Sequence, residues 1–361
     1  MKRLGAAVVL SALGAGVPAA AQTSLEIRID TRPAREILGT LTRPKFEPSD
    51  AKVLEDMPAI ELSIRDSARD RQVFERDLGA AFDRESRVAV FDFRSVREQA
   101  ERWSALVAVL DSKSVELSRM AVSRASAVLP ADRPVAAKLT AAFSFGLAGL
   151  ADHIVAKNPD GGELLVVDLR RAVADSEGEP PEARLARLAS LIAGEAFRQA
   201  WGIYRAGSPA WKSTDIAPRP FETFLRTVAE AGPVALFSVD EAFFPLATWL
   251  KDLQKKSFND LQRAAEHLAE SDTELEKRVE VLGELKKPDF VNRVASPAGM
   301  FMADGIRQVA GPEGLKAAMA GGPHAFFEAY DRASQKNKEL LQLSKLLKER
   351  LAAAAKAAPK P

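Results

Sequence analysis

The chain has 361 residues and nearly balanced charge, with 51 lysines and arginines against 50 aspartates and glutamates. Because nucleic-acid binding needs a dense basic surface, this balance argues against a nucleic-acid partner. The chain contains no cysteine, which excludes disulfides, thiolate catalysis and cysteine-ligated zinc.

The first 21 residues have the pattern of a cleaved signal peptide. Lys2 and Arg3 form a short basic region, residues 4–16 are small and apolar, and residues 17–21 end in an Ala-x-Ala pattern. We expect cleavage after Ala21 and a periplasmic or secreted protein. The apolar run is shorter than the roughly 20 residues that a membrane-spanning helix needs, and no later stretch reaches that length. We therefore expect no transmembrane segment after cleavage.

Residues 22–135 are predicted to form a mostly helical region. It begins with a strand, "SLEIRID" (24–30), in which apolar and polar residues alternate. A helix follows at 33–41. Residues 42–60 are predicted to be a loop because they are polar and contain three prolines. From there to Leu129 the pattern is helical.

Two strands are predicted next, at 137–146 and at 163–169, because both are short apolar runs bounded by Pro, Gly or Asn. A loop then leads to a helix at 182–203. The rest of the chain is predicted to be helical, with an amphipathic, highly charged stretch at 245–287 and a last helix within 331–356 that ends in a frayed tail.

Glu195 lies on the apolar stripe of the 182–203 helix. It follows Leu185, Leu188 and Ile192 at spacings of three and four residues, which places all four on one helical face. Burying an ionised carboxylate costs on the order of several kcal/mol unless a cation or hydrogen-bond donors meet it. The sequence therefore predicts a charged partner for Glu195.

The usual catalytic motifs are missing from the sequence. His153, His267 and His324 are the only histidines, and no two are four residues apart. We interpret each as an exposed or capping residue. The chain has no P-loop, no dinucleotide-binding glycine pattern and no Gly-x-Ser-x-Gly elbow.

The order of elements resembles zinc-dependent peptidases of gluzincin type. In that family one helix carries His-Glu-x-x-His, a second helix supplies a glutamate ligand, and a late Gly-x-x-Met-Ala-like segment packs around the site. Here the 163–169 strand, the 182–203 helix, "VAEAGPVALF" and a late segment follow in that order. The late segment keeps the family's rhythm at Gly299, Met302, Ala303, Gly311, Leu315, Phe327 and Tyr330.

The resemblance implies an α+β fold that is mainly α-helical, with gluzincin-like architecture and a small β-sheet beside the 182–203 helix. It divides the chain into the signal peptide (1–21), the N-terminal region (22–135), a metallopeptidase-like region (136–332), and a C-terminal helix and tail (333–361).

The zinc motif itself is degenerate. Placing Glu195 at the family's general-base position puts Gly194 and Arg198 at the two histidine positions. Glycine has no side chain, and an arginine guanidinium stays protonated and has no lone pair for a metal. Glu230 matches the third-ligand position only after a one-residue shift. We therefore expect no metal cofactor, although zinc would be the metal if other ligands complete a site.

Arg198 offers a replacement for the lost cation. We hypothesise that it lies between Glu195, one turn away, and Glu230 on the neighbouring helix. The alternative is that Glu195 reaches water at the edge of the apolar stripe and that Arg198 is an ordinary surface residue.

Three functions remain open from the sequence. The first is a metallopeptidase-like protein that is no longer an enzyme and binds a peptide or protein in the cell envelope. The second is an active zinc-dependent peptidase with non-standard ligands, such as Glu195 and Glu230 with His324 or His153. The third is an all-helical envelope scaffold or chaperone-like protein.

Overall fold

The structure is a computed structural model that describes residues 23–83, 90–147, 151–158, 161–174, 179–212, 220–238, 248–269, 275–285 and 294–357. The expected signal peptide at 1–21 lies outside the described residues. The described chain is mainly helical and contains one four-stranded sheet. The predicted α+β class is confirmed, and the all-helical alternative is excluded.

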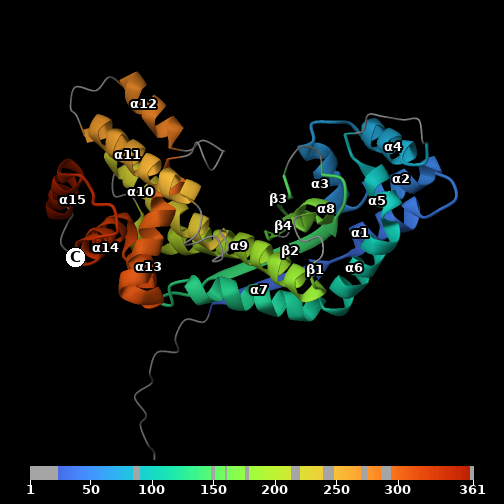
Figure 1. The fold of residues 1–361 in the computed structure, drawn as a ribbon, viewed down its shortest axis with the longest axis horizontal. Coiled ribbons are helices and arrows are strands. Elements are labelled where there is room, and N and C mark those ends of the chain that lie inside the picture. Colours follow the sequence, from blue (N-terminus) through green and yellow to red (C-terminus); the bar gives the residue numbers. More distant parts are fainter. Residues whose placement is uncertain are drawn as a thin grey trace, which may run out of the picture.

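Four strands form one mixed sheet (Figure 1). Its order is β1 (Ser24–Asp30), β2 (Ala136–Ser144), β4 (Glu163–Asp168) and β3 (His153–Lys157). β1, β2 and β4 are parallel, whereas β3 runs antiparallel to β4 at the edge. The three predicted strands are confirmed as β1, β2 and β4. β3 is not predicted from the sequence. Because β1 pairs with β2, the sheet spans the boundary predicted at residue 135.

In the described part of the chain, seven helices lie between β1 and β2. They are α1 (Arg32–Leu41), α2 (Pro48–Glu55), α3 (Pro58–Asp66), α4 (Arg71–Ala80), α5 (Phe93–Glu98), α6 (Ala100–Ser112) and α7 (Ser114–Val128). The prediction that residues 42–60 form a loop is wrong. Pro48 and Pro58 begin α2 and α3, since proline in the first helical turn lacks only an amide hydrogen that would have no partner there.

The two faces of the sheet meet different helices, because alternate residues of a strand point to opposite faces. One face joins the main core with α7 and with α9 (Pro181–Gly207), through residues that include Ile27, Leu139, Phe143, Leu165 and Val167. The other face packs against α3, through Ala142, Leu164 and Val166. The face that a strand residue occupies therefore decides whether it meets α9.

The helix α9 links the sheet to a helical region at the other end of the molecule (Figure 1). That region contains α10 (Pro220–Ser238), α11 (Thr248–Ala269), α12 (Leu275–Glu284), α13 (Ala295–Ala320), α14 (Gly322–Lys336) and α15 (Lys345–Ala357). Among the described residues, α9 is flanked by α8 (Leu169–Ala172) and the 3-10 turn η2 (Pro209–Trp211).

The helices α10 and α13 cross in backbone contact at Gly232 and Gly299. A Cβ atom on Gly232 would lie 2.4 Å from the Gly299 carbonyl, and one on Gly299 would lie 2.5 Å from the Val228 carbonyl oxygen. Only glycine leaves room for this approach. Gly299 of the late segment is therefore explained by helix packing.

The predicted C-terminal helix differs in detail from the observed one. Within 331–356 the chain leaves the helix after Lys336 and resumes it at Lys345. The segment between them is held to the core because the Tyr330 hydroxyl donates to the Leu341 carbonyl at 2.7 Å and Leu340 and Leu343 are buried. Among the described residues, no helix is both long and apolar enough to cross a bilayer.

Candidate functional site

The helix α9 carries the residues that the sequence analysis singled out. Leu185, Leu188 and Ile192 are buried on its core face, as the spacing predicts. Glu195 continues this stripe toward the edge of the sheet, where 15% of its side chain is exposed. Its carboxylate therefore lies at the border of the core and needs charged partners.

Arg198 is the first partner of Glu195. Its Nε lies 2.6 Å from Glu195 Oε2, and its Nη2 lies 2.6 Å from Glu163 Oε2 at the start of β4. Every second residue of a strand lies on the same face, so Glu163 shares the α9 face with the core residues Leu165 and Val167. Arg198 thus joins α9 to the sheet through two carboxylates.

His153 is the second partner; from the sequence it is paired with Glu195 only as one of two alternative metal ligands, not as a charged partner. It begins β3, opposite Val167, so its side chain also faces α9. Its Nε2 lies 3.4 Å from Glu195 Oε1, and its Nδ1 lies 2.6 Å from Asp152 Oδ1. Predicting this contact requires knowing that β3 is the neighbour of β4. We call the group of Asp152, His153, Glu163, Glu195 and Arg198 the β3–α9 ion-pair cluster.

The pKa values of the cluster favour the charged form of each shifted group. Burial alone would lower the pKa of His153, but the hydrogen bonds from its ring to the Asp152 and Glu195 carboxylates raise it to about 9. Burial would raise the pKa of Glu195, but His153 and Arg198 outweigh it and lower that pKa. At neutral pH the positive charges of His153 and Arg198 therefore balance the negative charges of Asp152 and Glu195.

Glu230 lies away from this cluster, contrary to the hypothesis that it shares Arg198 with Glu195. Its carboxylate pairs with Arg205, and its carbonyl accepts a hydrogen bond from Trp201 Nε1 at 3.2 Å. Arg205 follows Arg198 by two helical turns, about 10 Å along the axis. The helices α9 and α10 are antiparallel, so later residues of α10 lie nearer to Arg198.

The position of Gly194 illustrates this offset. A Cβ atom built on Gly194 would lie 3.6 Å from Ser238 Oγ, and the ring of Phe197 stacks on Phe237 at 4.9 Å. The last turn of α10, and not the turn with Glu230, therefore lies beside Gly194 and Phe197. The alignment of Glu230 with the family's third ligand does not hold in space.

Metal ligands are not assembled at this site. Gly194 contributes no side-chain ligand, and Arg198 contributes only hydrogen-bond donors, of which Nε and Nη2 meet two carboxylates. Within the described ranges, no group of three or more His, Asp or Glu side chains is arranged to hold a metal ion. Of the histidines considered as ligands, His153 reaches Glu195, whereas His324 pairs with Glu222 at 2.8 Å.

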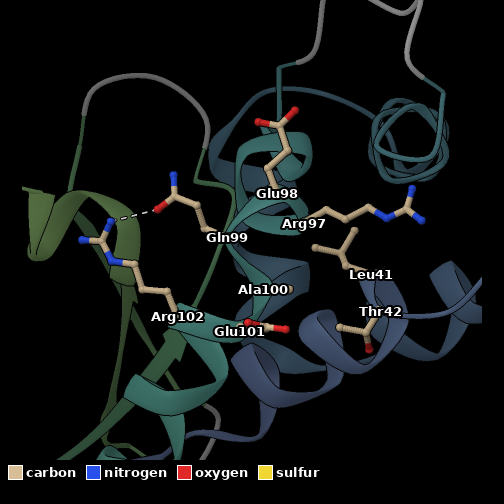
Figure 2. Close-up of a pocket in the computed structure, with 8 residues that line it drawn as sticks. All are labelled: Leu41, Thr42, Arg97, Glu98, Gln99, Ala100, Glu101 and Arg102. Carbon is tan, nitrogen blue, oxygen red and sulfur yellow. Dashed lines mark hydrogen bonds between the residues drawn. The ribbon is translucent and has the colours of Figure 1, made fainter.

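A surface hollow of about 550 Å³ lies elsewhere, between the end of α1 and the junction of α5 with α6 (Figure 2). Its lining mixes both charges: Leu41, Thr42, Arg97, Glu98, Gln99, Ala100, Glu101 and Arg102. Arg102 donates to Gln99 at 2.9 Å, and Arg97 lies 4.0 Å from the centre of the Phe82 ring. The hollow shares no residue with the β3–α9 ion-pair cluster.

The outer edge of β3 adjoins the cluster. The Asp168 amide donates to the Asp152 carbonyl at 2.9 Å, and the Asn158 amide donates to the Gly162 carbonyl at 2.8 Å. In an antiparallel pair, the main-chain amide and carbonyl groups of alternate residues point toward the partner strand. Those of residues 152, 154, 156 and 158 therefore point toward β4. His153, Val155 and Lys157 therefore direct their amide and carbonyl groups outward.

The two edges of the sheet differ. At β1, Ser118 of α7 donates its hydroxyl to the Ile27 carbonyl at 2.6 Å. At β3, no described residue forms a hydrogen bond with the outward main-chain groups of residues 153, 155 and 157. These groups form an edge onto which a further strand could pair.

One condition that the peptidase resemblance sets is met, because β4 lies in a sheet beside α9. The other, convergence of Glu230 with Glu195 and Arg198, is not. Comparisons of the chain with models of protein families, with curated proteins and with solved structures found no match.

Proposed function

We propose that this chain is an exported, metallopeptidase-like protein that does not hydrolyse peptides. It binds an extended segment of a peptide or protein in the cell envelope, and the segment pairs with the outer edge of β3. The observation that carries this proposal is the row of outward amide and carbonyl groups on His153, Val155 and Lys157.

The β3–α9 ion-pair cluster supports the non-catalytic part of the proposal. In the peptidases that the sequence resembles, the glutamate of the zinc helix acts beside a metal-bound water. Here both oxygens of Glu195 face cations, Arg198 at 2.6 Å and His153 at 3.4 Å. These partners lower the pKa of Glu195, whereas a general base works best with a pKa near the working pH.

The cluster also suits a binding role because it anchors the edge strand. Asp152 and His153 stand at the start of β3, where His153 meets Glu195 of α9. At the other end of β3, Glu163 lies opposite Lys157 and is tied to α9 through Arg198. An edge strand held in its extended form before binding needs little ordering when a peptide pairs with it, which favours affinity.

A proline at position 155 tests the edge directly. Val155→Pro removes one outward amide hydrogen while leaving the hydrogen bonds to β4 in place, and proline is tolerated at such edge positions. Val155→Ala is the matched control, because it shortens the same side chain and keeps the amide. The probe is a labelled, blocked peptide of alternating Thr and Val residues.

We expect Val155→Ala to bind this peptide much like the unmodified protein. Val155→Pro should bind it roughly tenfold more weakly, since it loses a main-chain hydrogen bond and gains a steric clash. A copy of the peptide that is N-methylated at alternate residues should also bind weakly. Equal affinity of the two variants in a fluorescence anisotropy titration would contradict the proposal.

A second candidate function is a peptidase with non-standard metal ligands. The proximity of His153 Nε2 to Glu195 Oε1 favours it, because it places one imidazole beside one carboxylate. Metal analysis of the purified protein decides between the two. Stoichiometric zinc that is lost in His153→Ala, together with hydrolysis of a casein substrate, would overturn the non-catalytic assignment.

A further inference from the structure

The charges beside the outer edge of β3 are unevenly balanced. Among the three residues whose main-chain groups point outward, His153 and Lys157 carry cationic side chains. His153 is already paired with Asp152 and Glu195. Lys157, at the other end of the strand, is exposed, and no described carboxylate lies within ion-pair distance of its ammonium group. We propose that β3 selects a peptide with an acidic side chain at the position opposite Lys157. This inference rests on the proposed function.

The register of the sheet explains why Lys157 has no ion-pair partner among the described residues. Glu163 lies directly opposite it on β4. The Glu163 carboxylate turns to Arg198, whose Nη2 it meets at 2.6 Å, and only 14% of the Glu163 side chain is exposed. Arg198 thus binds Glu163, the acidic residue opposite Lys157 on β4. The other position opposite Lys157 lies on a strand that would pair with the outer edge of β3.

Cross-strand geometry places the peptide side chain within reach. In antiparallel pairing, side chains of directly opposite residues lie on the same face with Cβ atoms about 4.5 to 5.5 Å apart. The peptide residue opposite Lys157 would therefore project toward the α9 face beside the ammonium group. The next residue on that face would lie opposite Val155, which packs against the main core. The expected pattern is acidic, any residue, apolar.

A second copy of the chain does not meet this requirement. The sequence of β3 is HIVAK and contains no acidic residue. When two copies pair antiparallel so that all three outward-facing residues take part, Lys157 of each lies opposite His153 of the other. Like charges directly opposite each other are unfavourable, so the charge pattern favours an acidic peptide over self-association.

Two peptides of identical composition test the selection. They are acetyl-Glu-Thr-Val-Thr-Lys-amide and acetyl-Lys-Thr-Val-Thr-Glu-amide, which carry the same label at the same position. In the unmodified protein, the peptide with glutamate opposite Lys157 should bind roughly twofold to fivefold more tightly than the swapped one. Because the contact is exposed, the difference should shrink as salt is added.

Three variants separate this inference from the proposed function. Lys157→Gln should abolish the preference and Lys157→Glu should reverse it. Lys338→Glu makes the same charge change at another exposed lysine and should leave the preference intact. Binding that is weakened by Val155→Pro but shows no preference in any variant would overturn the selection alone. Absence of peptide binding, or a dimer in sedimentation that Val155→Pro abolishes, would overturn both.

Discussion

Two arginines two turns apart on α9 show how differently one residue type can be used. Arg198 meets two carboxylates, Glu195 and Glu163, and links α9 to the sheet. Arg205 pairs with Glu230 and lies over the rings of Trp201 and Trp211, at 5.6 and 5.7 Å from their centres.

The pKa values of the two guanidinium groups shift in opposite directions. Burial lowers the pKa of Arg205, and the single carboxylate of Glu230 does not compensate. Burial also acts to lower the pKa of Arg198, but Glu195 and Glu163 together raise it. The comparison teaches that the number of carboxylates, and not burial alone, decides whether a partly buried cation is stabilised. Arg198 is thus an electrostatic link, whereas Arg205 is mainly a packing residue.

Removing Arg198 should have the largest effect on stability. Arg198→Ala leaves Glu195 and Glu163 as partly buried carboxylates without their shared cation. We expect a loss of about 2 to 3 kcal/mol in the free energy of unfolding at pH 7, below the value for a fully buried pair because 39% of Arg198 is exposed.

Urea denaturation measures this change. Arg187→Ala is the control on the same helix, because its partner Glu179 is exposed, and it should cost less than about 0.5 kcal/mol. An unchanged stability of Arg198→Ala would show that the link between α9 and the sheet contributes nothing.

His153 should make stability depend on pH on the alkaline side. Its pKa is about 9 in the folded protein, above the ordinary value of 6.5. Its contribution is therefore complete below pH 6.5 and is lost as the pH rises through 9. We expect the unmodified protein to lose about 2 kcal/mol more than His153→Gln over this interval, after a discount for partial exposure of the ring.

Thermal and urea unfolding at a series of pH values will show this slope. His324→Gln removes another histidine that pairs with a glutamate and should retain the slope. Parallel pH profiles for the unmodified protein and His153→Gln would mean that the cluster does not hold the imidazolium.

Arg205 should tolerate an uncharged replacement better than Arg198 does. In Arg205→Met, the unbranched apolar side chain keeps the packing on Trp201 and Trp211, while Glu230 is exposed enough to be solvated. We expect a loss below about 1 kcal/mol, with little change in tryptophan fluorescence. A loss as large as that of Arg198→Ala would erase the distinction between the two sites.

Several features of the site could be read from the sequence. The three-and-four spacing of apolar residues predicted α9 and placed Glu195 on its inner face, and the i to i+3 spacing placed Arg198 within reach. The alternation in 24–30 and the valine-rich run at 163–169 predicted two strands of the sheet. These predictions held because they depend on local periodicity, which the backbone geometry sets.

Other features required the tertiary structure. Pro48 and Pro58 were interpreted as loop residues because a proline pattern alone does not show whether a helix begins there. His153 was interpreted as a capping or exposed residue because β3 is only five residues long and its pairing with β4 is not visible in its own sequence. The alternation along β4 places Glu163 on the α9 face, but only the packing of α9 on the sheet brings Arg198 to it.

The sequence by itself determined that a carboxylate lies at the edge of a buried helix and that a nearby arginine could neutralise it. Only the tertiary structure decided that the second carboxylate is Glu163 and not Glu230. The physical reason is the antiparallel packing of α9 and α10, which moves Glu230 two turns away, while strand register brings Glu163 and His153 to the α9 face.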